Sequence, residues 1–208
     1  MPSPWQWDDV SKRYRNVESG RYIGQRQMVS LRDVFTEAMK GDTDRMTRQL
    51  ANGEISLGRW QLDMQSRVKQ VITDQYALSV GGRNAMAPSD WGRVGRMTQD
   101  QYRYLEQFAA EIRTGKLSAG QIQTRARMYM NSGTAAYEKG NAASRGMPGL
   151  PQYPGDGGTQ CRTNCQCHWD IGETDTEWQA FWRLGVAEHC PDCVALADLY
   201  NPWTAPKV

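Results

Sequence analysis

The chain has 208 residues, enough for one sizeable core and a small second unit. Hydrophobic residues make up 39% of it, the mean hydropathy is −0.73, and no apolar run approaches the roughly 20 residues of a membrane helix, so we expect no membrane contact. The net charge of +2 is unevenly divided: residues 1–147 hold 22 Lys and Arg against 15 Asp and Glu, whereas residues 148–208 hold 3 against 8. Because blocks of clustered Lys or Arg are missing, this charge does not indicate a dedicated nucleic-acid binder.

Residues 1–27 are polar, aromatic and rich in Arg, with no helical period. This composition predicts an extended N-terminal arm that a partner orders. We expect the arm to make its partner contacts through Arg13, Arg15, Arg21, Tyr22 and Arg26. The alternative for these side chains is a solvated, disordered leader.

Two similar stretches in residues 28–139 predict two helix–loop–helix units. GEISLGRWQLDM starts at Gly53 and GKLSAGQIQTRARM at Gly115, 62 positions later, and both follow one frame of Gly, charge, aliphatic and Ser. In each copy the glycine ends one helix, and a serine, Ser56 or Ser118, caps the next. Repeated units of this build predict an antiparallel helical bundle.

The other helix boundaries follow from capping signals. Helices are predicted to begin at Ser30 and at Thr98, and Gly41 is predicted to end the first of these. The stretch NAMAPSDWGRVGRM, residues 84–97, is rich in Gly and has no period, so it is predicted to be a loop. The last helix of the bundle is predicted to cover residues 118–139.

The composition changes after the bundle. Residues 140–160 are dominated by Gly and Pro, which predicts a linker, and residues 161–208 contain every cysteine of the chain. The pattern is C-x3-C-x-C, then 22 residues, then C-x2-C, formed by Cys161, Cys165, Cys167, Cys190 and Cys193. We expect this segment to be a small, loop-rich module stapled by zinc, because it has too few aliphatic residues to fold by burial alone.

Zinc explains these cysteines better than disulfides do. The number of cysteines is odd, and a C-x-C pair is too tight to bridge without strain. Cys190 and Cys193 are the surest ligands, and the other two come from the three earlier cysteines. His168 and His189 each adjoin a cysteine, and we expect both to lie around the site or at the surface. Free buried thiols are the alternative to metal binding.

The motifs do not indicate an enzyme. A zinc deaminase would need a Glu two positions after its His or Cys, followed by P-C-x-x-C, but here Asp170 follows His168 and the proline lies inside the second cysteine pair. No G-x-S-x-G, H-E-x-x-H or Walker sequence is present. We therefore predict a structural zinc and no catalytic residue.

Several of these stretches together resemble the head-morphogenesis or minor head proteins of tailed bacteriophages. The likeness is carried by RYRNVESGRYIGQRQMV, GEISLGRWQLDM, SDWGRVGRMTQDQYRYLEQFAAEIRTGKLSAGQIQTRARMY, GDGGTQCRTNCQCHW and EHCPDCVALA, and it spans residues 13–198. It implies a helical body with a small cysteine-rich C-terminal module, located in the phage head near the portal. In similar proteins the C-x2-C pair often precedes the C-x3-C-x-C stretch, and here the order is reversed.

The residues and the resemblance lead to one expectation. We expect a non-enzymatic structural component of a phage particle, present in the virion, and in the host cytoplasm during assembly, that docks in several copies on capsid, portal or neck subunits. The alternative is a zinc-containing nucleic-acid-binding protein that acts in genome packaging.

Overall fold

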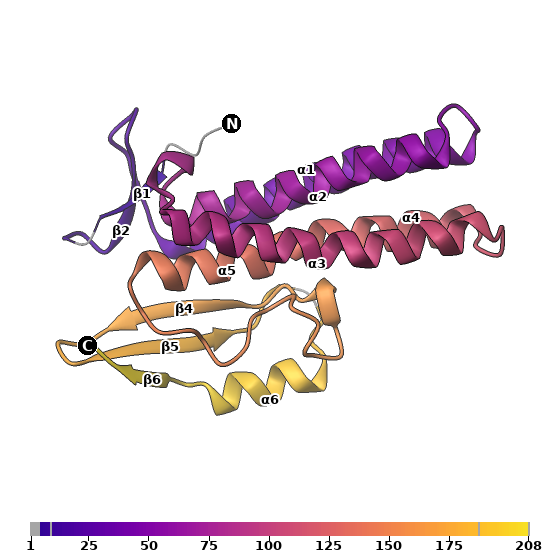
Figure 1. Ribbon diagram of the computed structural model, residues 1–208. Helices are drawn as coiled ribbons and strands as arrows, with labels where there is room; N and C mark the ends of the chain where they lie inside the picture. The colour runs from indigo at the N-terminus through magenta and orange to yellow at the C-terminus, as the bar shows by residue number, and fades with distance from the viewer. Residues whose placement is uncertain (1–4, 9, 187, 208) are drawn as a thin grey trace.

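The computed structural model describes residues 5–8, 10–186 and 188–207, and these are mostly helical, with two small antiparallel sheets. In Figure 1 the long helices form an upper layer, and the C-terminal sheet lies beneath α5. The helices are α1 (Gln25–Ala51), α2 (Leu57–Val80), α3 (Pro88–Arg113), α4 (Ala119–Met128), α5 (Ser132–Ser144) and α6 (Pro191–Leu199). Short 3-10 turns cover Arg83–Ala85, Tyr129–Asn131 and Arg162–Asn164. The predicted mainly helical class is confirmed.

The repeated capping frame behaves as predicted. The Ser56 hydroxyl accepts a hydrogen bond from the backbone N–H of Arg59 (3.2 Å) at the start of α2. Ser118 and Gln121 form a reciprocal capping box at the start of α4. Gly53 and Gly115 both have φ near +70°, the left-handed conformation that only glycine adopts without strain.

The predicted helix boundaries at Ser30, Gly41 and Thr98 are wrong. Helix α1 begins at Gln25, so Ser30 and Gly41 lie inside it. Helix α3 begins at Pro88, ten residues before Thr98, and the predicted loop is mostly helical. Proline occupies the first helical position, and the Asp90 carboxylate accepts the backbone N–H of Ala87 (2.9 Å). These start signals and tertiary packing outweigh the cost of the glycines, about 1 kcal/mol each.

Helix α5 packs closely against α2 because its sequence, SGTAAYEKGNAAS, is rich in small residues. A Cβ atom at Gly133 would lie 2.8 Å from Gln75 Cγ, and a Cβ at Gly140 would lie 2.0 Å from Ser79 Oγ. Both glycines therefore permit the approach of the two helices.

The predicted N-terminal arm is instead a three-stranded sheet that packs on the chain's own helices. Strand β2 (Arg13–Asn16) pairs antiparallel with β1 (Trp5–Asp8) and with β3 (Tyr22–Ile23). Tyr14 is buried among Met28, Val29 and Tyr137, and its hydroxyl donates to Asn141 Oδ1 (3.1 Å). Buried and exposed side chains alternate with a period of two residues in this strand: Tyr14 points inward, and Arg13 and Arg15 point outward. A search for a helical period does not detect this alternation.

The C-terminal unit is also a sheet rather than a collection of loops. Strand β5 (Glu177–Arg183) pairs antiparallel with β4 (His168–Glu173) and β6 (Trp203–Pro206). Its core is aromatic: Trp169 and Trp182 are buried, with ring centroids 5.3 Å apart in an edge-to-face contact. Two tryptophans of about 200 Å² each supply the burial that aliphatic residues do not.

Part of the predicted linker, residues 140–160, belongs to the helices and part to the core of the C-terminal unit. Helix α5 continues to Ser144, and Met147 and Leu150 join the core around Trp169. None of the described helices is both long and apolar enough to cross a lipid bilayer.

Candidate metal centre

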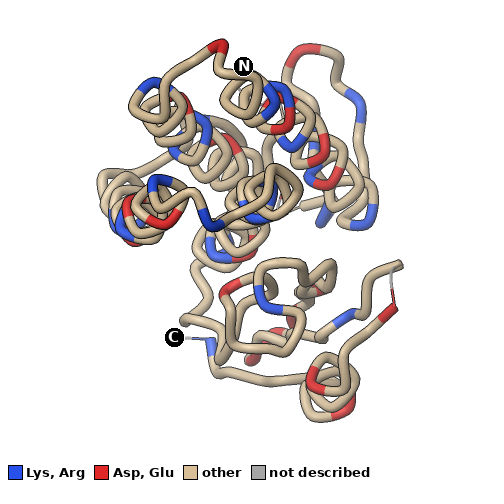
Figure 2. The backbone as a smooth tube through the Cα atoms, turned by 90° about the vertical axis from the view of Figure 1, so that its right-hand side faces the viewer, with Lys and Arg blue, Asp and Glu red and all other residues tan. Residues whose placement is uncertain are grey.

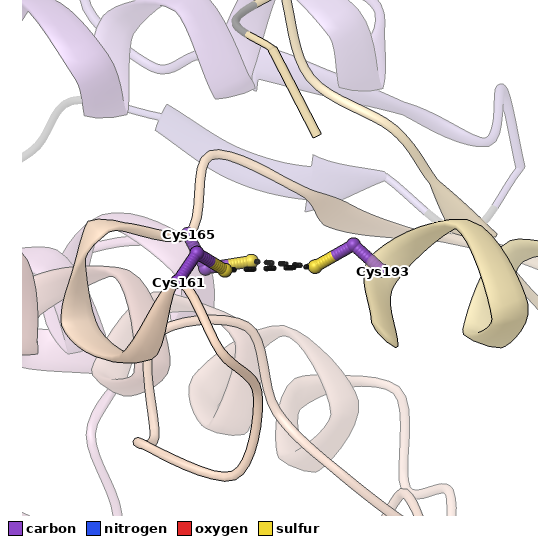
Figure 3. A group of neighbouring side chains, drawn as sticks. All are labelled: Cys161, Cys165 and Cys193. Carbon is purple, nitrogen blue, oxygen red and sulfur yellow. Dashed lines mark hydrogen bonds between the residues drawn. The ribbon is translucent and has the colours of Figure 1, made fainter. Parts of the chain in front are cut away.

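Three cysteines from two separate segments bring their sulfur atoms together (Figure 3). Cys193 Sγ lies 3.6 Å from Cys161 Sγ and 3.7 Å from Cys165 Sγ, and all three sulfurs are within 4.8 Å of one another. The thiols are free of disulfide bonds. Sequence-distant thiols at this spacing form a set of ligand atoms for a metal ion.

The spacing fits a tetrahedral thiolate site. With a Zn–S bond of about 2.3 Å, neighbouring sulfurs of a regular tetrahedron are about 3.8 Å apart. The separations of 3.6 and 3.7 Å are close to that edge. Thiolate is the ligand that Zn²⁺ and other soft metals prefer, so the donor set suits zinc.

Local structure places these ligands on both sides of the site. A 3-10 turn, Arg162–Asn164, separates Cys161 from Cys165, and Arg162 adopts a left-handed conformation with φ of 49°. Such a conformation costs a non-glycine residue about 1 kcal/mol or more, and packing or a bound ion must offset it. Cys193 is the third residue of α6 and is buried.

The other two predicted ligands adjoin this group. Cys190 is the N-cap residue of α6, and its thiol interacts with those of Cys161 and Cys193. Cys167 is buried beneath the group, where its thiol interacts with those of Cys165 and Cys193. Neither thiol lies within 4.8 Å of all three sulfurs of the group, so either would have to move closer to become a fourth ligand.

Mutual hydrogen bonding divides the thiols into proton donors and acceptors. The side-chain hydrogen bond with Cys165 lowers the pKa of Cys167 to about 6, and the same bond raises the pKa of Cys165. Burial raises the pKa of Cys193. Burial also acts on Cys190, but backbone N–H groups of Cys193 and Cys161 outweigh it and lower its pKa. Thiolate character is thus already favoured at two of the five sulfurs.

Polar contacts hold the ligand segments to their surroundings. Asp192 on α6 accepts the backbone N–H of Gln160 (2.8 Å), which joins the two ligand segments directly. Asn164 accepts from the Asn131 amide (2.9 Å), which joins the turn between Cys161 and Cys165 to the helices. The site is therefore braced on both sides.

Neither histidine belongs to the sulfur group formed by the described residues. His168 lies in β4, and burial followed by the charge of Arg32 lowers its pKa to about 4, so it is neutral at physiological pH. Asp170, the acid in the deaminase-like spacing, lies 3.7 Å from Arg183. Within the described part of the chain no carboxylate lies in the metal-ligand group.

The residues predicted to contact a partner are at the surface of the N-terminal sheet and the start of α1. Their side chains are exposed, and Tyr22 donates its hydroxyl hydrogen to Asp8 Oδ2 (3.0 Å). The Arg13 guanidinium donates to the Tyr22 carbonyl (3.4 Å) and lies over its ring. The structure therefore places these residues on an ordered surface of the chain.

Sequence reasoning missed a buried ion pair that joins the helices to the C-terminal sheet. Arg32 on α1 donates to the Glu138 carboxylate on α5 (2.9 Å), and both side chains are fully buried. The other Glu138 oxygen accepts the backbone N–H of Trp169 in β4 (3.3 Å). Burial raises the pKa of Glu138 to about 7, against the opposing charge of Arg32. The only sequence signal is one acid within a helix of small residues.

No protein-family model matches the chain, and comparison with curated proteins and with solved structures gives no match.

Proposed function

We propose that this chain is a non-enzymatic structural protein whose C-terminal unit is held by one zinc ion. The convergence of Cys161, Cys165 and Cys193 on one point carries the proposal. Cys190 is the fourth ligand, because the N-cap and the third residue of a helix face the same side of its first turn. Cys167 then remains a buried thiol against Trp182.

The donor set argues for a structural rather than a catalytic metal. A catalytic zinc keeps one position for water and has a general base beside it. Here five sulfurs compete for four positions, and no acid or imidazole of the described residues joins them. When bound, the ion would cross-link α6 to the turn before β4.

The setting we propose is the head of a tailed bacteriophage, where the protein docks in several copies on capsid, portal or neck subunits. The resemblance to minor head proteins supplies this setting. Packed antiparallel helices with a braced terminal unit suit a rigid building part. Gln25 Nε2 donates to the Trp169 carbonyl (2.8 Å), and together with the Arg32–Glu138 pair it supports a fixed position of the C-terminal unit on the helices.

Nucleic-acid binding stays the second candidate, favoured by the exposed arginines of the N-terminal sheet. The helical body weakens it, because basic and acidic positions are interspersed along the helices (Figure 2). Arg59, Arg83 and Arg93, for example, each pair with a carboxylate. Binding to unrelated DNA that falls steeply with the logarithm of salt concentration would support this function, and indifference to DNA would remove it.

The test compares two single variants. Cys190→Ser should release zinc and loosen residues 155–208 to proteolysis, with helical circular dichroism largely retained. Cys167→Ser is the matched control, and it should keep one zinc per chain. Normal metal content in Cys190→Ser with loss in Cys167→Ser would reassign the fourth ligand. Full metal content in both variants, or none in the native protein, would contradict the site.

A further inference from the structure

A long groove separates the helices from the loop that leads to the metal ligands. Its larger part, about 830 Å³, lies between α3, the turn before α5, and residues 155–163. A second part of about 400 Å³ continues it toward Tyr153. Both parts are lined by Met97, Asp100 and Lys139, so they form one continuous surface.

The groove is basic and partly apolar. Three of its cations, Arg96, Lys139 and Arg162, have no carboxylate partner among the described residues. Its other cations are neutralised, as Arg103 is by Asp100. Flexible or exposed apolar side chains also line it, namely Met97, Tyr104 and Met128. Lys139 also lies over the ring of Tyr153, 5.3 Å from its centroid. A surface with a few cations that lack a carboxylate partner, between methionines and a tyrosine, suits an acidic, amphipathic protein segment better than a run of phosphates.

Helix α6 has the complementary chemistry and lies elsewhere on the molecule. In Figures 1 and 2 it lies at the edge away from the long helices, and no α6 residue lines the groove. Val194, Asp198 and Leu199 are exposed, and Val194 and Asp198, four residues apart, share a helix face. Leu199 is 67% exposed, a large fraction for a leucine. The helix has two acids and no base.

We propose that α6 of one copy docks in this groove of the next copy. Asp198 then faces Lys139 and Arg96, and the apolar positions of α6 contact Met97 and Tyr104. Groove and helix are different surfaces of the same chain, so the contact is heterologous and joins copies head to tail into a ring or a filament. The unequal division of charge along the sequence, basic before residue 148 and acidic after it, fits this polarity.

This contact deepens the proposed function, because it names a second copy as one partner of the assembly. It is also linked to the metal site. Residues 155–157 and 162–163 line one wall of the groove, and Cys161 directly precedes that wall's Arg162. Helix α6 begins at the ligands Cys190 and Cys193. Metal binding should therefore organise both halves of the contact.

The experiment measures the mass of the zinc-loaded full chain by sedimentation velocity over a range of concentrations. The native protein should associate as concentration rises, and less so at high salt. Asp198→Lys should weaken association about tenfold or more, because it places like charges together. The matched control is Asp175→Lys, an exposed acid in the turn between β4 and β5, which should associate as the native protein does.

The groove is tested in the same way. Arg96→Glu with Lys139→Glu should also weaken association about tenfold or more. Arg113→Glu with Lys116→Glu, at the end of α3 and in the loop that follows it, should not. A mixture of the groove variant with Asp198→Lys should associate again through the swapped charges. This rescue would be absent if either variant were simply misfolded.

The possible outcomes separate this contact from the proposed function. A zinc-loaded chain that stays monomeric at every concentration would overturn the contact and leave the structural zinc in place. Equal effects of the control and test variants would also overturn it. DNA binding that the groove variant abolishes and Asp198→Lys leaves unchanged would overturn it in favour of a nucleic-acid groove. Loss of association in the metal-free chain would support the link between the metal and the contact, whereas association that is unchanged without metal would overturn that link.

Discussion

Replacing Gly140 by alanine tests the close packing of α5 on α2 most sharply. In a solvent-exposed helix this change stabilises a protein by about 1 kcal/mol, because alanine has the higher helix propensity. At position 140 the new Cβ would lie 2.0 Å from Ser79 Oγ and 3.0 Å from the Tyr76 carbonyl oxygen. Real Cβ atoms do not approach so closely, so the contact has to relax.

The relaxation is costly for two reasons. Ser79 Oγ is held by a hydrogen bond to the Tyr76 carbonyl (2.7 Å), which rotation of the side chain would break. The Tyr76 oxygen is helix backbone, which moves only if α2 and α5 separate. Overpacking of this kind costs about 1–3 kcal/mol, so the expected sign is opposite to that of helix propensity.

Thermal and urea unfolding of the zinc-loaded chain measure the effect. We expect Gly140→Ala to lower the free energy of unfolding by about 1–3 kcal/mol and Tm by several degrees, at about 2–4 °C per kcal/mol for a chain of this size. Gly41→Ala in α1 is the matched control, because no neighbouring group lies within 4 Å of the position that its new Cβ would occupy, and it should be stabilising by about 0.5–1 kcal/mol.

A second variant distinguishes steric overlap from other causes. Ser79→Ala removes the hydroxyl, so Gly140→Ala should cost less in that background than in the native one. If Gly140→Ala stabilises the protein as Gly41→Ala does, the two helices do not approach as described.

Three further perturbations test other parts of the structure. Glu138→Gln should abolish a pH dependence of stability. Because the raised pKa of Glu138 keeps its proton on the folded state up to about pH 7, the native protein should lose about 2.5 kcal/mol of stability relative to the variant between pH 5 and pH 8. Equal pH slopes of the two proteins in urea titrations would refute this. Tyr14→Ala should destabilise by about 3–5 kcal/mol and open residues 5–23 to protease, whereas Tyr104→Ala, at an exposed position, should do neither. Removal of metal by a chelator should expose residues 155–208 to protease before residues 25–144, and simultaneous cleavage of both would contradict a locally acting ion.

Much of the helical part is predictable because its signals are local. Ser56, Gly81 and Ser118 delimit helices by capping chemistry that acts within four residues. The predicted start of α3 is wrong because the proline at its first helical position precedes a glycine-rich stretch that is typical of a loop. Leu31 and Val34 fit a core position by their spacing, but α1 turns them toward solvent, at 40% and 69% exposure.

The two sheets and the inter-unit ion pair are not predictable in the same way. Strands β2 and β3 are four and two residues long, which is too short to show an alternating pattern in the sequence. Their position also depends on the packing of Tyr14 against Tyr137, which lies far away in the sequence on α5. The sequence predicts the metal site as a set of five thiols. The spacing C-x3-C-x-C does not reveal which of its three sulfurs points away from the metal site. Only the fold shows that Cys161 and Cys165 lie next to Cys193.

The most direct measurement of the central claim is the metal content of the purified chain, followed by the absorption spectrum of its cobalt-substituted form. We predict one zinc ion per chain and, with cobalt, the intense charge-transfer and ligand-field bands of a tetrahedral site with four sulfurs. A chain without metal, or a cobalt spectrum that shows an oxygen ligand from bound water, would contradict a closed structural site.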